Sequence, residues 1–173
     1  FRSGWAGVKG GDRNDPVQLK NVAAALSLYE LALDSGAEYF LGVGSQAEYG
    51  PREGRIAEDC ETKPTTLYGL AKLSVANLLS AASTRSSLKF GWFRLFSTYG
   101  PGDDLSWMIP YVANELLASR KPSLTKAEQI WDYLYIEDVA DALIAGIDLN
   151  AEGIFNLGSG DPIDRKSTRL NSS

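Results

Sequence analysis

Short apolar runs alternate with longer Ala/Leu-rich stretches along the whole chain, and this order limits the possible folds more than any other feature. The longer stretches place apolar residues at helical spacing. They predict helices at residues 17–35, 67–82, 108–118 and 137–149. The short runs predict strands at residues 39–43, 89–96, 132–136 and 153–157. Strands and helices that alternate at this spacing favour an α/β fold, in which right-handed crossovers build a parallel sheet covered by helices on both faces.

Composition and charge exclude several classes of protein. The chain has 173 residues, 44% of them hydrophobic, which is enough for one domain with a sizeable core. No apolar run approaches the roughly 18 residues of a membrane helix, and a net charge of -5 argues against a nucleic-acid or acidic-membrane partner. The chain has no histidine, which excludes Ser-His-Asp hydrolases, Cys-His proteases and most zinc enzymes; no metal site is expected. Cys60 is the only cysteine, which fits a reducing cytoplasm.

Tyr68 and Lys72 stand four residues apart in a predicted helix, so both lie on one face of it. A phenol with a pKa near 10 is a poor acid or base at neutral pH, but a neighbouring ammonium would lower that pKa. The pair could then move a proton to or from a substrate hydroxyl. On spacing alone, a packed tyrosine beside a solvated lysine is the more common outcome.

Ser45 follows the strand predicted at residues 39–43, so it lies at the carboxyl end of the sheet. Open α/β folds place their ligands at this edge. The hydroxyl of Ser45 could bind the same substrate oxygen as Tyr68. By itself, Ser45 could equally be a cap at the strand end.

Four further segments occur in a defined order. Residues 45–50 read Ser-Gln-Ala-Glu-Tyr-Gly, residues 94–103 read Arg-Leu-Phe-Ser-Thr-Tyr-Gly-Pro-Gly-Asp, residues 131–140 read Trp-Asp-Tyr-Leu-Tyr-Ile-Glu-Asp-Val-Ala, and residues 155–160 read Phe-Asn-Leu-Gly-Ser-Gly. Together with the Tyr68 and Lys72 pair, they resemble segments of the extended short-chain dehydrogenases/reductases, the group of nucleotide-sugar epimerases, dehydratases and reductases. The resemblance covers residues 1–163.

This resemblance implies a Rossmann-like, doubly wound parallel sheet, NAD or NADP as cofactor, and a nucleotide-sugar substrate. The implied catalytic residues are Ser45, Tyr68 and Lys72. The implied cofactor-binding residues are Gly4, Trp5, Asn21, Ser45, Tyr68, Lys72 and Phe96. The implied substrate-binding residues are Gln46, Ser97 and Trp131. In the family, Gly4 and Trp5 would lie where the fourth strand passes the cofactor.

The family's Gly-rich phosphate turn and its ribose-reading acidic residue have no match in this chain. Residues 7–11 are rich in glycine but follow no visible strand. We therefore expect residues 1–163 to be a partial NAD(P)-binding domain, truncated at both ends and inactive alone. Residues 164–173 match the translation of a common sequencing-library adapter without a mismatch, so we expect them to be a non-native tail.

Three departures from the family pattern bear on the substrate. Gln46 and Ala47 stand where 4,6-dehydratases have Asp and Glu, so we expect no such dehydration. Ser97 replaces an Asn that helps to bind the substrate diphosphate. Trp131 replaces an Arg with the same partner, and it offers stacking and one N–H in place of a planar fork. Either another cation, such as Lys121 or Lys126, supplies the positive charge of the missing Arg, or the substrate differs from the usual nucleotide-sugar.

The sequence therefore predicts a cytoplasmic NAD(P)-dependent epimerase or oxidoreductase acting on a nucleotide-sugar. A ketone reductase with a non-sugar substrate and a catalytically silent, dinucleotide-sensing protein of the same fold are the alternatives. The resemblance also implies a homodimer of the full-length protein, in which helices at residues 17–35 and 65–82 pair with their twins. Small side chains on more than one face of both helices suit the close approach that this requires.

Overall fold

The computed structural model describes residues 4–7, 12–124 and 130–161. The chain divides into two compact units. The first unit comprises Phe1–Leu95 and Leu143–Asn156, and the second comprises Phe96–Ala142 and Leu157–Ser173. The tail predicted to be non-native, residues 164–173, lies outside the described residues.

A three-stranded sheet forms the centre of the first unit. Strand β1 (Tyr39–Ser45) pairs in parallel with β2 (Lys89–Leu95), and this register places Ser45 opposite Leu95. Strand β5 (Gly153–Leu157) lies on the other side of β2, so the order is β1-β2-β5. A single turn of 3₁₀-helix, η1 (Gln46–Glu48), follows β1 directly. The sequence pattern had predicted no helix at these three residues.

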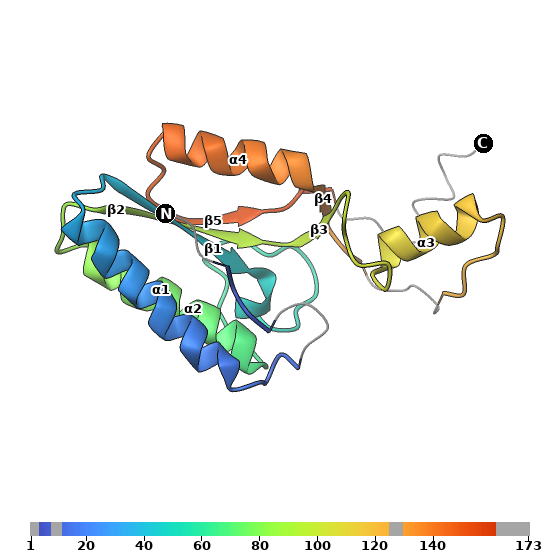
Figure 1. Cartoon of the computed structure of the whole chain (residues 1–173), viewed down its shortest axis with the longest axis horizontal. Helices are drawn as coiled ribbons and strands as arrows, with labels where there is room; N and C mark the ends of the chain where they lie inside the picture. The colour runs from blue at the N-terminus through green and yellow to red at the C-terminus, as the bar shows by residue number, and fades with distance from the viewer. Residues whose placement is uncertain (1–3, 8–11, 125–129, 162–173) are drawn as a thin grey trace. The chain divides into compact units, whose positions relative to one another are not determined.

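Two long helices lie side by side against one face of this sheet, α1 (Val17–Asp34) and α2 (Leu67–Ser83) (Figure 1). Local chemistry sets their ends. The carboxylate of Asp15 accepts a hydrogen bond from the Val17 N–H at 2.7 Å, and Gly36, with φ +70°, follows the end of α1. The hydroxyl of Thr66 caps α2 by accepting from the Gly69 N–H at 3.1 Å.

The core of the first unit lies between these helices and β2. The buried residues that form it are Tyr29, Ala32, Val75, Ala76, Leu79, Leu88, Phe90 and Trp92. On the opposite face of β2, Phe93 stacks on Phe155 with ring centroids 5.0 Å apart. A Cβ added to Gly146, near the end of helix α4 (Ile136–Asp148), would lie 2.6 Å from the Phe93 ring, so the helix packs tightly onto this face. Both faces of the sheet are therefore covered, as expected for buried parallel strands.

The described residues of the second unit form a two-stranded parallel sheet and a complete helix. Strand β3 (Ser97–Tyr99) pairs with β4 (Tyr133–Tyr135), and α3 (Met108–Leu117) lies between them in sequence. Helix α4 (Ile136–Asp148) begins in this unit and ends in the first. The sequence pattern predicted no strand between residues 96 and 108, which is wrong for residues 97–99.

The predicted helices and strands otherwise match the structure to within one or two residues at each end. The α/β class with parallel pairing is therefore confirmed. Within the described part of the chain, no helix is both long and apolar enough to cross a membrane.

Candidate active site

Ser45, Tyr68 and Lys72, here called the Ser-Tyr-Lys cluster, come together at the carboxyl end of β1. Ser45 is the last residue of the strand, and its hydroxyl forms a hydrogen bond with the Tyr68 phenol. Lys72 lies one turn further along α2, and its Nζ donates to the Val43 carbonyl oxygen at 2.7 Å. Tyr68 and Lys72 are 7% and 6% exposed, so the cluster is largely shielded from water.

The start of α2 is held by two backbone contacts, one to Arg13 before α1 and one to Ala47 in η1. The Tyr68 N–H donates to the Arg13 carbonyl oxygen at 2.8 Å. A Cβ on Gly69 would lie 2.4 Å from the Ala47 carbonyl oxygen, so only glycine permits this approach. The absence of a side chain at this position therefore brings Tyr68 within reach of Ser45.

Ser45 has a second function besides its bond to Tyr68. Its hydroxyl accepts a hydrogen bond from the Ala47 N–H at 3.2 Å, and the Glu48 carboxylate accepts from the Ser45 N–H at 2.8 Å. This reciprocal pair is a capping box around η1. The two interpretations of Ser45 from sequence, a cap and a site residue, are thus both compatible with its position.

Lys72 is surrounded by aromatic rings and one carbonyl group. Its Nζ lies 3.9 Å from the centroid of the Trp5 ring and 6.0 Å from that of Trp92. Burial lowers the pKa of Lys72 from its ordinary 10.5 to about 8, while the negative charge of Glu48 acts in the opposite direction. A site lysine with this pKa can change protonation state close to neutral pH.

We expect Lys72 to lose its proton at about pH 8. Between about pH 8 and pH 10.5 the unfolded chain then binds more protons than the folded chain. The free energy of unfolding therefore rises with pH across that window, and this contribution is lost as the pH falls through 8. NMR titration of ¹³C-labelled lysine side chains measures the midpoint, and Lys72→Met identifies the signal. A midpoint near 10.5 would contradict this expectation.

The pKa of Tyr68 is raised, which differs from the sequence-based expectation. Burial is the largest cause; the hydrogen bond from Ser45 and the charge of Arg13 act to lower the pKa, and Glu48 adds to the increase. The guanidinium carbon of Arg13 lies 5.3 Å from the Tyr68 ring centroid. The Lys72 ammonium, expected to lower this pKa, is instead hydrogen-bonded to the Val43 carbonyl. In this state, the phenol of Tyr68 is protonated at neutral pH.

The segment that carries Gly4 and Trp5 is irregular and forms no strand. The indole N–H of Trp5 donates to Gln18 Oε1 at 2.6 Å, and the Trp5 ring meets Tyr68 edge-on with centroids 6.5 Å apart. The side-chain amide of Asn21 bonds both the N–H and the carbonyl of Ala6, at 3.1 and 2.9 Å. Trp5 is thus part of the site, Asn21 holds the segment beside it, and Gly4 is exposed.

The remaining predicted site residues divide between the two units. Gln46 lies half-buried in η1, directly after Ser45. Phe96 and Ser97 are in the second unit, where the Phe96 N–H donates to the Leu157 carbonyl oxygen at 2.9 Å and Ser97 begins β3. Trp131 is 41% exposed in the same unit. Of the two lysines considered as substitutes for the missing Arg, Lys121 is exposed and Lys126 lies outside the described residues.

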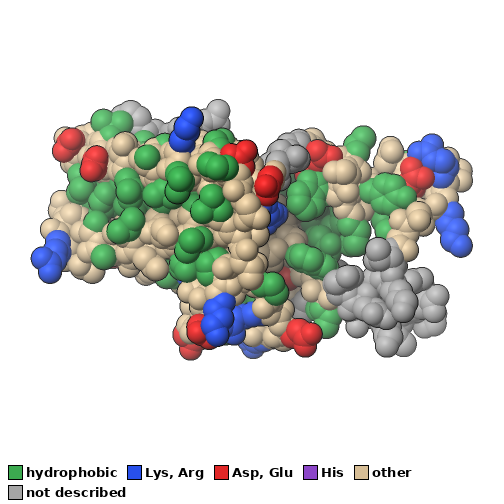
Figure 2. Space-filling model, turned by 90° about the horizontal axis from the view of Figure 1, so that it is seen from below, with side chains coloured by type: hydrophobic (Ala, Val, Ile, Leu, Met, Phe, Trp, Pro, Cys, Tyr) green, Lys and Arg blue, Asp and Glu red, His purple; other side chains and the backbone are tan. Residues whose placement is uncertain are grey.

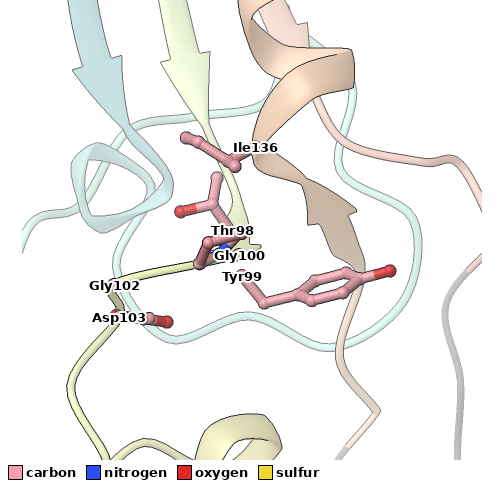
Figure 3. Close-up of a pocket in the computed structure, with 7 residues that line it drawn as sticks. Thr98, Tyr99, Gly100, Gly102, Asp103 and Ile136 are labelled. Atoms are coloured by element: carbon pink, nitrogen blue, oxygen red, sulfur yellow. The ribbon is translucent and has the colours of Figure 1, made fainter.

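A pocket of about 190 Å³ lies in the second unit (Figure 3). Its lining residues are Thr98, Tyr99, Gly100, Pro101, Gly102, Asp103 and Ile136. They come from the end of β3, the turn that follows it and the start of α4. A Cβ at Gly100 would lie 2.3 Å from an Ile136 methyl group, so the glycine brings this turn against α4. The pocket thus follows directly on Ser97, one of the predicted substrate-binding residues.

Comparison with known proteins gives the family. Residues 6–158 match the model of the NAD dependent epimerase/dehydratase family. The chain belongs to this family. The match includes every residue of the Ser-Tyr-Lys cluster and the whole pocket lining.

Individual relatives of this epimerase/dehydratase chain are similar over about half of their own length. A UDP-glucose 4-epimerase from Corynebacterium glutamicum is 28% identical over 160 residues, which covers 82% of this chain and 49% of that protein. The structure of MoeE5 in complex with UDP-glucose and NAD superposes with a TM-score of 0.73 at 27% identity, over 85% of this chain and 51% of that one. A UDP-N-acetylglucosamine 4-epimerase from Methanobrevibacter ruminantium M1 has a TM-score of 0.81 at 22% identity, over 89% and 52%, which shows the shared fold.

Sequence reasoning missed a buried ion pair in this member of the family. Arg94 Nε donates to Glu48 Oε2 at 2.7 Å, and the two side chains are 2% and 0% exposed. Two signals were available: Ser45 and Glu48 fit the spacing of a capping box, and Arg94 interrupts an otherwise apolar strand. A charge in a buried strand requires a partner, but the sequence alone does not identify it.

Proposed function

We propose that this chain carries the proton-transfer site of an NAD-dependent enzyme that acts at a hydroxyl-bearing carbon of a nucleotide-sugar, as an epimerase or oxidoreductase. The observation that carries the proposal is the Ser-Tyr-Lys cluster at the carboxyl end of β1, in a chain that belongs to the epimerase/dehydratase family. Three hydrogen-bonding groups converge there in a nearly dry environment, where each interaction is stronger than in water.

Each residue of the cluster has a distinct chemical role in this proposal. The Tyr68 phenol gives a proton to, or takes one from, the reacting sugar oxygen. The Ser45 hydroxyl donates a hydrogen bond to the same oxygen. The Lys72 ammonium stabilises the phenolate that forms when Tyr68 gives up its proton, and its pKa of about 8 allows it to share that proton. NAD, when bound, supplies the hydride acceptor and donor.

The residues of the first unit fit the nicotinamide and ribose end of NAD. Lysine has three N–H donors, and one of those on Lys72 goes to the Val43 carbonyl. Others can serve ribose hydroxyls, and Trp5 borders the same ammonium. MoeE5, which shares this fold at 27% identity, was solved with NAD bound. Phe96, Asn21 and Gly4 remain proposals as cofactor-binding residues.

A ketone reductase with a non-sugar substrate is the second candidate. It is favoured by Ser97 and Trp131, which stand in place of the Asn and Arg that bind the substrate diphosphate in the family pattern. Trp131 is partly exposed and presents a ring for stacking in place of a charge. A silent, dinucleotide-sensing protein is less well supported, because Tyr68 and Lys72 are both present and in contact distance of the other site groups.

The proposal is tested by assaying the full-length protein with NAD and UDP-hexoses. We expect interconversion of C4 epimers, or oxidation of the sugar, and no 4-keto-6-deoxy product. Dehydration requires an acid and a base beside Ser45, and Ala47 cannot transfer a proton. Formation of a 4-keto-6-deoxy sugar would contradict the assignment of Gln46 and Ala47. Activity on simple ketones with none on UDP-hexoses would favour the second candidate.

We also propose that the full-length protein is a homodimer through α1 and α2. Figure 2, which views the molecule from the side of these helices, shows hydrophobic side chains across this face. The exposed hydrophobic residues of α1 and α2 include Leu19, Leu31, Leu70 and Leu78, which are 45–63% exposed. Light scattering at micromolar concentration should give twice the mass of one chain. A mass of one chain, unchanged by substituting Leu19 and Leu78 with Lys, would contradict the proposal.

A further inference from the structure

Glu48 is a fully buried carboxylate whose two oxygens are both occupied. Oε1 accepts hydrogen bonds from the Ser45 N–H at 2.8 Å and from the Trp92 indole N–H at 3.0 Å. Oε2 accepts from Arg94 Nε at 2.7 Å. Its exposed fraction is 0%, so a carboxylate here is stable only because its charge and lone pairs have partners.

Two glycines in β1 make room for these partners. A Cβ on Gly42 would lie 2.2 Å from the Trp92 ring, and one on Gly44 would lie 2.3 Å from the indole nitrogen and 2.4 Å from Glu48 Oε1. Because neither residue has a side chain, the indole lies across β1 and reaches Glu48. The hydrogen bonds to the Glu48 carboxylate at the end of β1 therefore depend on Gly42 and Gly44 as much as on the polar residues.

Arg94 is anchored in turn by Tyr49 and, through it, by a residue of β5. Its Nη1 donates to the Tyr49 hydroxyl at 2.8 Å, and that hydroxyl donates to Asn156 Oδ1, also at 2.8 Å. The chain of bonds runs from the end of β1, through β2, to β5. It gives the Glu48 carboxylate one fixed position relative to the sheet.

We propose that Glu48 is a positioning residue of the Ser-Tyr-Lys cluster: its carboxylate, fixed by Arg94 and Trp92, holds Ser45 in hydrogen-bonding position toward Tyr68 through the Ser45 N–H. The capping box joins Ser45 to the same carboxylate, so the strand end cannot shift without breaking either the Ser45–Glu48 hydrogen bond or the ion pair. The inference rests on the proposed function for the role of the cluster, whereas the contacts themselves are independent of it.

Glu48 affects the Ser-Tyr-Lys cluster through its negative charge as well as through its hydrogen bonds. It raises the pKa of both Lys72 and Tyr68. At Lys72 this opposes burial, which lowers the pKa, and at Tyr68 it adds to burial, which raises the pKa. The other charged group facing Tyr68 is Arg13, and Lys72 faces the rings of Trp5 and Trp92. Loss of Glu48 should therefore change the titration of Lys72, which a purely structural residue would leave alone.

The test compares Glu48→Gln with the unaltered chain by hydrogen exchange and by lysine titration. We expect the Ser45 amide to exchange about tenfold faster or more relative to the Leu79 amide in the core of α2, because its charge-assisted hydrogen bond to a carboxylate becomes a weaker bond to a neutral amide oxygen that has lost the ion pair with Arg94. We also expect the Lys72 titration midpoint to fall below its value of about 8. Both changes are required. If Ser45 and Leu79 accelerate alike, or if the Lys72 midpoint stays in place, the proposal is overturned.

Two further variants keep the test decisive. Glu48→Met combined with Arg94→Leu removes both buried charges at once, so it provides a folded reference if Glu48→Gln alone does not fold, and the same two changes are expected in it. Glu58→Gln is the matched control, because Glu58 accepts from the Asn156 N–H at 2.8 Å but has no bond to Ser45. It should leave both readouts unchanged. Neither readout depends on turnover, so a failed activity assay and a failed positioning test are distinguishable.

Discussion

Tyr68→Phe in the full-length protein is expected to lower turnover by about 10²-fold or more and to change cofactor affinity little. The substitution removes the transferable proton and keeps the ring, so packing against Trp5 and beneath Arg13 is retained. A positioned acid or base contributes about 10²- to 10⁴-fold to a rate, which sets the size of the expected loss. Steady-state kinetics together with a cofactor titration would separate the two effects.

Two companion variants make the result specific. Tyr39→Phe removes a half-buried phenol, which donates to the Ala151 carbonyl at 2.8 Å in the same unit, and it should leave turnover nearly unchanged. Lys72→Met should impair both turnover and cofactor binding, because we assign Lys72 to the phenolate and to the ribose. A fully active Tyr68→Phe enzyme would refute the assignment of Tyr68 as acid and base.

Arg94→Met is expected to destabilise the fold by about 3–5 kcal/mol, since it leaves the buried Glu48 charge without its counterion. Urea unfolding of the chain, followed by circular dichroism, measures the loss as a lower midpoint. Removing one partner of a buried ion pair destabilises a fold strongly, whereas replacing both partners by apolar residues of similar volume changes the stability much less. The double variant Arg94→Leu with Glu48→Met should therefore recover most of the lost stability.

An exposed ion pair provides the control for this prediction. Arg120 Nη2 lies 2.6 Å from Glu115 Oε1, a distance similar to that between Arg94 and Glu48, but its side chain is 58% exposed. Water and salt screen such a pair, so Arg120→Met should change the unfolding midpoint little. Equal losses in the two variants would mean that burial is not what makes the Arg94 pair important.

The sequence by itself determined the elements whose signals are local. Helical spacing of apolar residues located α1 and α2, and the same spacing placed Tyr68 and Lys72 on one helix face. The order of strands and helices led to the α/β class, and Ser45 was predicted at the carboxyl end of a strand from its neighbours alone. Apart from the order of the elements along the chain, each of these inferences uses residues within a single helix or strand.

Only the tertiary structure decided the features that join distant segments. Strand β3 is three residues long and exists because Ser97 pairs with Tyr133, a partner that no local pattern names. Arg94 and Glu48 are separated by 46 residues in sequence, and the parallel register of β1 and β2 brings their side chains together. The pKa of Tyr68 depends on how deeply α2 buries the phenol, and so it came out raised where spacing to Lys72 had predicted a lower value. Periodicity reports which face of an element is buried, whereas partners, register and depth of burial are set by contacts between elements.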